Sequence, residues 1–208
     1  MNKTLKIFKE YNLDYYLNCL INYNNGNNNP YHNFYHTITV VKNIYSISNS
    51  MKIDENIIRL LLIAGIFHDF DHSGGKFPDD YNITNAIIKF NQFTKESKED
   101  NEFIESIIKC TQFPYNKEKD VSLTDYQKII RDADVIQWLE DNYLQQVVFG
   151  LNKEFTTEDV ISIKQLEGQI GFMRSIKIFT EYAQIKVNEQ LEQKCQDCEY
   201  LINVLSKE

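Results

Sequence analysis

Helical periodicity is the feature of this sequence that most restricts its fold. Apolar side chains recur three and four residues apart along most of the chain, and its three prolines interrupt none of the long periodic segments. The last segment is broken near Gly168 and Gly171. No pair of β-rich runs is joined by a hairpin turn. We therefore expect an all-α, compact bundle of about seven helices. The predicted segments are 5–21, 38–47, 57–67, 83–90, 103–108, 126–148 and 160–205.

Length and charge limit the class of protein. The 208 residues suit one domain over residues 1–208, with a core over about 31–175 and a C-terminal helix over about 176–206. The formal net charge of -8 disfavours a nucleic-acid polymer as a partner. The only arginines are Arg59, Arg131 and Arg174, too few for a guanidinium cluster that recognises phosphate. If the protein handles phosphate, metal ions must carry most of the positive charge.

Neither a membrane segment nor a disulfide framework is expected. The charged N-terminus lacks the apolar run of a secretory signal, and no stretch reaches the ~20 apolar residues of a membrane span. The four cysteines are too scattered for a disulfide framework. These features predict a cytoplasmic protein with reduced thiols. Cys195 and Cys198 form an isolated CxxC, which is weak evidence for zinc and favours ordinary helix residues.

All four histidines lie in two short segments of the chain. His32 and His36 are four residues apart, as are His68 and His72, which predicts that each pair shares one face of a helix. A single histidine is more often a surface or core residue than a ligand. Two such pairs beside aspartates, with no histidine elsewhere, instead favour a metal site.

Acidic residues complete the candidate metal site. Asp69 follows His68 at the end of the apolar run 61–67, where an unpartnered carboxylate would cost several kcal/mol. A divalent cation would supply the partner, and a structural salt bridge is the alternative. Asp132 and Asp134 lie in a second apolar segment, and residues two apart on a helix point in different directions. A set of imidazoles and carboxylates suits Zn²⁺, Mn²⁺ or Fe²⁺, with Mg²⁺ or Mn²⁺ at an adjacent second site.

Four short motifs follow one another along the chain. Residues 31–36 are YHNFYH, residues 68–74 are HDFDHSG, Ala133-Asp134 comes next, and residues 169–173 are QIGFM. They resemble the YHNxxH, HDxDHPG, Ala-Asp-Leu and QxGF[IM] motifs of the class I 3′,5′-cyclic nucleotide phosphodiesterases. That family belongs to the HD-domain metal-dependent phosphohydrolases. The histidine motifs alone match the superfamily, and QxGF favours the narrower family. The resemblance implies a multi-helix HD-domain bundle.

The resemblance also implies which residues hold metal ions. The first ion would be bound by His36, His68, Asp69 and Asp134. Asp69 would also reach the second ion, which makes it a catalytic residue. Asp132 is the alternative to Asp134, because some other HD proteins have an Arg-Asp pair at this place.

The same resemblance implies roles for residues around the metals. His32 would be the general acid, His72 would hydrogen-bond a metal-bound water, and Asn33 would have a structural or orienting role. Gln169 would bind the edge of a purine base and Phe172 would stack on its face. Without the resemblance, Gln169 would be interpreted as a surface residue and Phe172 as a core residue.

The chain departs from the family pattern at three places. Ser73 replaces the proline of HDxDHPG, and no histidine follows His72 to form the family's ENHH element. Gln137 stands where an asparagine that touches the nucleotide is expected. Gln137 is therefore a further candidate for substrate binding.

These features predict a metal-dependent phosphodiesterase that converts a 3′,5′-cyclic nucleotide, cAMP or cGMP, to the 5′-monophosphate. Two metal ions would supply a bridging hydroxide, and His32 would protonate the O3′ leaving group, an effect of about 10²–10⁴-fold. One alternative is an HD phosphohydrolase for another nucleotide, such as a nucleoside monophosphate or a cyclic oligonucleotide signal. A second is a sensor that binds nucleotide without turnover, against which the general acid argues. Orientation of Gln169 and Phe172 into the metal cleft would favour the cyclic mononucleotide.

Overall fold

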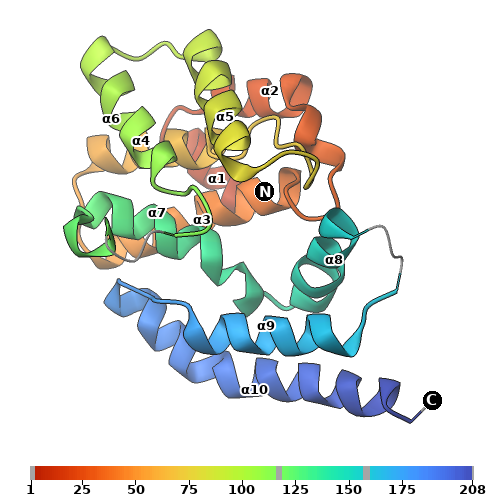
Figure 1. Ribbon diagram of the computed structural model, residues 1–208. Helices are drawn as coiled ribbons and strands as arrows, with labels where there is room; N and C mark the ends of the chain where they lie inside the picture. The colour runs from red at the N-terminus through yellow and green to blue at the C-terminus, as the bar shows by residue number, and fades with distance from the viewer. Residues whose placement is uncertain (1–2, 116–118, 157–159, 208) are drawn as a thin grey trace.

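The protein is built from helices throughout residues 3–115, 119–156 and 160–207, which the computed structural model describes. No strand occurs within these ranges, which confirms the predicted all-α class (Figure 1). The α-helices are α1 (Lys3–Glu10), α2 (Asp14–Tyr23), α3 (Phe34–Ser50), α4 (Glu55–Phe67), α5 (Asp79–Phe93), α6 (Lys98–Lys109), α7 (Asp125–Val135), α8 (Gly150–Phe155), α9 (Ile163–Ser175) and α10 (Glu181–Leu205). The shorter helical segments are η1 (Asn25–Asn28), η2 (Lys119–Ser122), η3 (Ile136–Leu139) and the π-helical η4 (Leu144–Phe149).

The described residues form ten α-helices where the sequence predicts about seven, because turns divide three of the predicted segments and α8 lies between the predicted segments 126–148 and 160–205. The segment 5–21 is divided at Asn12, whose φ of 54° lies in the left-handed region. The segment 126–148 is divided into α7, η3 and η4, and the segment 160–205 contains both α9 and α10. Apolar periodicity continues across each of these turns, so it does not reveal them.

The division between α9 and α10 differs from the predicted one. The sequence predicts a break near Gly168 and Gly171, but both lie within α9, where an added methyl group would meet nothing within 4 Å. The chain leaves the helix at residues 176–180 instead. There Asp132 accepts hydrogen bonds of 2.7 to 3.1 Å from the backbone N–H groups of the last two residues. A tertiary contact therefore makes α10 begin at Glu181, later than predicted.

Helices α3 and α4 pack closely, and their packing prepares the functional site. The start of α3 lies next to the end of α4, since the rings of His36 and His68 are neighbours. Gly65 of α4 faces Ile44 of α3, and a Cβ at Gly65 would lie 2.4 Å from Cδ1 of Ile44. The missing side chain lets the two helices approach closely, one helical turn before His68 and about two turns after His36.

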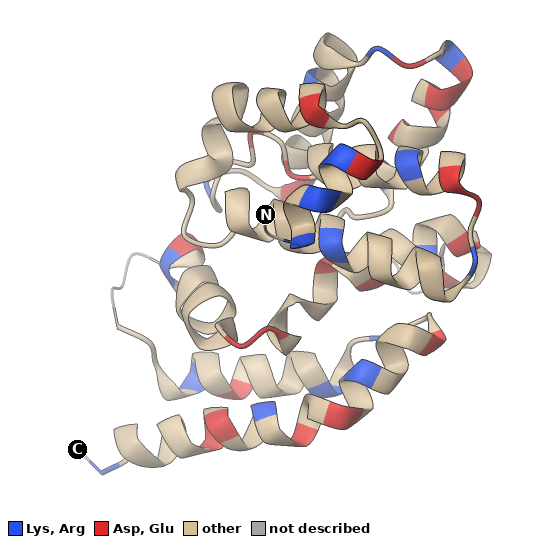
Figure 2. Cartoon of the chain, turned by 180° about the vertical axis from the view of Figure 1, so that it is seen from behind, with Lys and Arg blue, Asp and Glu red and all other residues tan. Residues whose placement is uncertain are grey.

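One cluster of buried apolar side chains runs from α1 to α10. Helices α9 and α10 pack along each other (Figure 1), and α10 also packs against η3 and α3. Basic and acidic residues are interspersed along α10 (Figure 2). Over the described residues, no helix has the length and apolar character needed to cross a membrane. The division of the chain into domains stays a prediction.

Candidate metal centre and substrate cavity

Two imidazoles and two carboxylates meet where the ends of α3, α4 and α7 come together. The Nε2 atoms of His36 and His68 are 3.1 Å apart. Oδ2 of Asp69 lies 3.0 Å from the first and 3.2 Å from the second. Oδ1 of Asp134 lies 3.2 Å and 3.6 Å from them. These four side chains, here called the metal cluster, therefore offer ligand atoms within 4.8 Å of one another.

Hydrogen bonds behind each imidazole turn its Nε2 atom toward the metal cluster. Nδ1 of His68 donates to the carbonyl oxygen of Gly65 at 2.8 Å. Nδ1 of His36 donates to the side-chain oxygen of Gln137. Because carbonyl oxygens only accept, each Nδ1 carries a proton, and each Nε2 is the nitrogen that would bind a metal.

Gln137 lies at a different place from the one that the sequence predicts. Instead of facing a nucleotide, its side chain is fully buried behind His36, and it does not belong to the wall of the neighbouring cavity. The reason is that η3 continues directly from α7 and turns this residue toward α3. Gln137 therefore orients a candidate metal ligand.

The electrostatics of the metal cluster favour a positive charge at its centre. Burial opposes the charged form of His36, but hydrogen bonds to Asp134 and Asp69 outweigh it and raise its pKa to about 9. Burial also lowers the pKa of His68, but Asp69 and Asp134 outweigh it and raise this pKa well above its usual value. Burial alone would raise the pKa of both carboxyls, yet the imidazoles lower it. Ionised carboxylates beside imidazole nitrogens fit Zn²⁺, Mn²⁺ or Fe²⁺.

Asp132 and Asp134 point to different parts of the structure. Asp134 lies in the metal cluster, whereas Asp132 is fully buried against the start of α10. Asp132 accepts a hydrogen bond of 2.7 Å from the hydroxyl of Thr180, in addition to the backbone contacts described above. Burial raises the pKa of Asp132 in spite of these hydrogen bonds. Asp132 therefore anchors α10, and Asp134 is the candidate ligand.

Neither histidine pair shares a helix, so the prediction from the four-residue spacing is wrong on this point. The side chain of Asn33 accepts a hydrogen bond of 3.1 Å from the backbone N–H of His36, and α3 begins after His32. The second pair follows the last residue of α4, and Asp71 has a left-handed φ of 59° that places His72 in a turn. Capping and turn formation override the helical pattern at both places.

His32 and His72 stack on each other beside the metal cluster, with ring centroids 3.7 Å apart. Nδ1 of His32 is 2.8 Å from Oε2 of Glu154, which also accepts from the backbone N–H of His32 at 3.3 Å. Nε2 of His72 lies 2.9 Å from Nδ2 of Asn82 and 3.9 Å from Oδ1 of Asp79. Burial, followed by the nearby His32, lowers the pKa of His72 to about 4. His72 is therefore neutral near pH 7, while His32 is held by a buried carboxylate.

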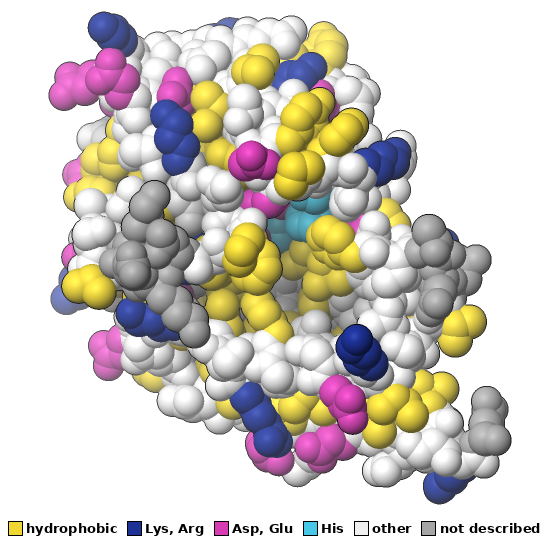
Figure 3. All heavy atoms as spheres, viewed as in Figure 1, with side chains coloured by type: hydrophobic (Ala, Val, Ile, Leu, Met, Phe, Trp, Pro, Cys, Tyr) yellow, Lys and Arg dark blue, Asp and Glu magenta, His cyan; other side chains and the backbone are white. Residues whose placement is uncertain are grey.

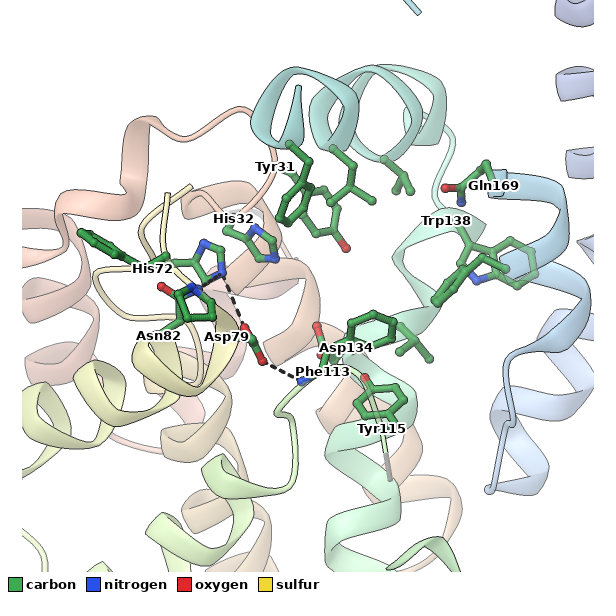
Figure 4. Close-up of a pocket in the computed structure, with 17 residues that line it drawn as sticks. Tyr31, His32, His72, Asp79, Asn82, Phe113, Tyr115, Asp134, Trp138 and Gln169 are labelled. Atoms are coloured by element: carbon green, nitrogen blue, oxygen red, sulfur yellow. Dashed lines mark hydrogen bonds and ion pairs between the residues drawn. The ribbon is translucent and has the colours of Figure 1, made fainter. Parts of the chain in front are cut away.

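A cavity of about 570 Å³ opens beside the metal cluster. Its wall includes Asp134, His32 and His72, as well as Gln169 and Phe172 from α9. Figure 3 shows histidine side chains within a hollow bordered by hydrophobic ones. Figure 4 shows His32 and Gln169 on opposite sides of this space. Since no described residue of the wall is a lysine or arginine, a bound phosphate needs metal ions for positive charge.

Helix α9 presents an amide and an aromatic ring to this cavity. Nε2 of Gln169 is buried and has no hydrogen-bond partner among the described residues. The ring centroid of Phe172 lies 6.5 Å from that of Phe113, edge to face. Residues three apart on a helix share a face, so the two side chains lie side by side. Such a pair suits the edge and the face of a planar heterocycle.

Several residues at or beside the cavity are missing from the sequence predictions. Glu154 is separated from His32 by 122 residues, and no local pattern links the two. Phe77, Phe113 and Phe155 border the cavity and are more than half exposed; we call these three the aromatic rim. In the sequence, Phe77 and Phe113 share one local feature that could have drawn attention to them, which is that each directly precedes a proline.

The CxxC pair lies on α10. Cys195 and Cys198 are buried free thiols, and burial raises the pKa of Cys198 to about 11. Neither belongs to the groups of three or more potential ligands found in the described part of the chain. Both cysteines therefore contribute to the core.

The two histidines and two aspartates of the metal cluster lie beside a cavity in an all-α bundle, an arrangement that suits a metal-dependent hydrolase. The HD domain family model matches residues 33–139. Because this match spans just over half of the 208 residues, the protein belongs to the HD domain family.

Comparison with solved structures supports the same architecture. The structure is similar to that of LmjPDEB1 in complex with IBMX. The TM-score is 0.65 at 15% sequence identity, over 95% of this chain and 83% of that chain. At this identity the likeness shows a shared fold. No curated protein sequence matches the chain.

Proposed function

We propose that this HD-domain protein hydrolyses a 3′,5′-cyclic nucleotide, cAMP or cGMP, to the 5′-monophosphate. The observation that supports this substrate class is the unpartnered amide of Gln169 beside the ring of Phe172, in the same cavity as Asp134. With the phosphate at the metal cluster, the base of a mononucleotide reaches both groups. Gln169 binds the edge of the base and Phe172 stacks on its face.

In this proposal the metal cluster would hold the first of two divalent ions, with His36, His68, Asp69 and Asp134 as its ligands. Asp69 would also bind the second ion. Divalent ions bound here supply positive charge for the phosphoryl oxygens and lower the pKa of the attacking water. The donor set favours Zn²⁺, Mn²⁺ or Fe²⁺ at the first position and Mg²⁺ or Mn²⁺ at the second.

His32 is the proposed general acid for the departing O3′. Glu154 accepts a hydrogen bond from Nδ1 of His32, which leaves Nε2 as the atom that transfers the proton. Because an alkoxide is a poor leaving group, this proton transfer contributes about 10²–10⁴-fold to the rate. His72 packs against the ring of His32, and Asn33 caps the helix that carries His36. These two residues position the groups that react.

The cellular location belongs to the same proposal. All four cysteines are free thiols. Because thiols persist in a reducing compartment, we propose a cytoplasmic enzyme.

A product analysis tests the proposal. Metal-loaded protein is incubated separately with cyclic mononucleotides, cyclic dinucleotides and nucleoside monophosphates, and the products are separated by chromatography. We expect 5′-AMP or 5′-GMP from the matching cyclic mononucleotide and no product from the Asp69→Ala variant. Inorganic phosphate from a monophosphate, or turnover of cyclic dinucleotides alone, would assign a different HD activity. Nucleotide binding without any product would identify a sensor.

A further inference from the structure

The cavity has a second aromatic wall, on the side of His32. The ring of Phe155 meets the ring of His32 edge to face, with centroids 6.2 Å apart. Phe77 lines the same cavity and packs against Tyr81 with ring centroids 4.5 Å apart. Phe77 and Phe155 are 52% and 60% exposed. Large apolar side chains that remain exposed around a cavity are typical of a binding site.

One residue that departs from the family pattern, Ser73, helps to build this wall. Ser73, which replaces the motif proline, accepts a hydrogen bond of 3.2 Å from the backbone N–H of Phe77. Gly75 has a φ of +76°, and a Cβ there would lie 2.5 Å from the carbonyl oxygen of Glu154. The loop after the second histidine motif therefore lies directly against the end of α8. This contact brings Phe77 and Phe155 to the same edge of the cavity.

A cyclic mononucleotide has no second base that could stack on this second aromatic wall. Its single base is bound by Gln169 and Phe172, and its departing O3′ stays attached to the same nucleoside. In an open phosphodiester, the departing O3′ belongs to a second nucleoside. That oxygen must reach His32, so the second nucleoside lies on the side of Phe77 and Phe155.

We infer that Phe77 and Phe155 form a second base-binding subsite, through which the protein also cleaves linear dinucleoside monophosphates. The inference rests on the proposed function and widens its substrate class. The oxygen of water bonds to phosphorus, the bond from phosphorus to O3′ breaks, and His32 gives its proton to O3′. The products are a nucleoside and a nucleoside 5′-monophosphate. A proton from the attacking water passes to solvent, which returns one to His32.

The charge of the cavity limits this class to substrates with a single phosphate. No described residue of the wall is a lysine or arginine. Asp79 lies on the wall beside His72, at 3.9 Å, and Glu154 lies behind His32. A terminal phosphate on the departing nucleoside would lie near the Asp79 carboxylate, and no lysine or arginine of the wall would pair with it. Dinucleoside monophosphates are therefore preferred over the same compounds with a 5′-terminal phosphate.

Equilibrium binding tests the subsite without turnover. The probe is a dinucleoside monophosphate with 2-aminopurine on the departing nucleoside and a methylene group in place of the scissile oxygen. We expect its fluorescence to fall on binding, because the aminopurine stacks on an aromatic ring. Phe77→Ala and Phe155→Ala should each raise its Kd about 5- to 100-fold, the effect of losing one base–aromatic stack. Phe149→Ala is the matched control, because Phe149 is 44% exposed and lies outside this wall.

Turnover distinguishes failure of the inference from failure of the proposed function. The ratio of kcat/KM for the linear substrate to that for the cyclic mononucleotide should fall about 5- to 100-fold in both variants. Phe172→Ala should lower both values and change their ratio less than about threefold. Hydrolysis of cyclic mononucleotide without binding of the probe, or variants with unchanged Kd and ratio, would overturn the inference alone. Probe binding that depends on both phenylalanines, in a protein inactive on cyclic nucleotides, would support the subsite and refute the proposed function.

Discussion

The metal cluster and the aromatic rim border the same cavity and are built in opposite ways. In the metal cluster, the side chains of His36 and His68 are 0% and 1% exposed, and a hydrogen bond fixes each ring. In the aromatic rim, Phe77 and Phe155 are more than half exposed and are carried by a loop and a helix end. The candidate metal ligands are therefore fixed by hydrogen bonds, whereas the rings of the aromatic rim are exposed and can contact a ligand.

This difference has an energetic consequence. A buried polar group that loses its partner pays the full cost of desolvation, so changes in the metal cluster should act strongly and together. An exposed ring contributes mainly by stacking on a ligand, so changes in the aromatic rim should act on affinity and by smaller factors.

The largest effect is expected from removing a candidate ligand. His68→Ala or Asp69→Ala should abolish metal binding and turnover together, because each side chain supplies ligand atoms to the metal cluster. Metal content by mass spectrometry and product release measure the two losses. Asp80→Ala, at an exposed aspartate at the start of α5, is the control. Turnover that survives the loss of stoichiometric metal would contradict the assignment.

The next effect separates chemistry from binding at His32. His32→Asn should leave the metal content and substrate affinity near normal while kcat falls by about 10²–10⁴-fold. The defect should shrink for a nitrophenyl phosphodiester, since an acidic leaving group needs no proton. Equal losses on both substrates, with metal retained, would show that His32 positions the phosphate or a water instead of donating the proton.

A substitution at Gln137 tests whether the hydrogen bond behind His36 contributes to metal affinity. Gln137→Leu removes the acceptor behind His36 and should weaken metal affinity about 10- to 100-fold. Competition with a chelator of known affinity measures this change. An unchanged metal affinity with an altered KM would instead support the nucleotide contact that the sequence predicts for this residue.

His72 gives a pH dependence of known sign. Its pKa is about 4 in the folded protein, while the unfolded chain has the ordinary value of about 6.5. The unfolded state therefore binds more protons in this window, and stability falls as the pH drops from 6.5 to 4, by up to about 3 kcal/mol. Urea unfolding of the metal-free protein at several pH values should show less of this loss in His72→Gln. The same pH dependence in both proteins would contradict the assignment.

The smallest expected effect is a difference in stability between two glycine substitutions, one in α4, which ends at the metal cluster, and one in α9, which lines the cavity. Gly65→Ala should destabilise the protein by about 1–3 kcal/mol, because the new Cβ would meet Cδ1 of Ile44. Adding Ile44→Val, which removes that atom, should recover part of the loss. Gly168→Ala in α9 meets nothing and should stabilise by about 0.5–1 kcal/mol. Equal effects of the two alanines in urea unfolding would show that the two helices are packed alike.

Much of this architecture could be predicted from the sequence because it depends on local pattern and residue chemistry. Apolar periodicity determined the all-α class, since spacing along a helix is a property of neighbouring residues. Residue types indicated a metal site, and the resemblance of the motifs to those of the cyclic nucleotide phosphodiesterases implied His36, His68, Asp69 and Asp134 as its ligands. These are the four side chains that the structure brings together.

Only the tertiary structure decided the remaining features, because each depends on contact between distant parts of the chain. The start of α10 is set by Asp132 on another helix, and the inward turn of Gln137 by the path of the chain after α7. Glu154 meets His32 across 122 residues. The second aromatic wall exists because the loop at Gly75 lies against α8. Periodicity and motif spacing record neighbours along the chain, whereas these contacts arise from the packing of complete helices.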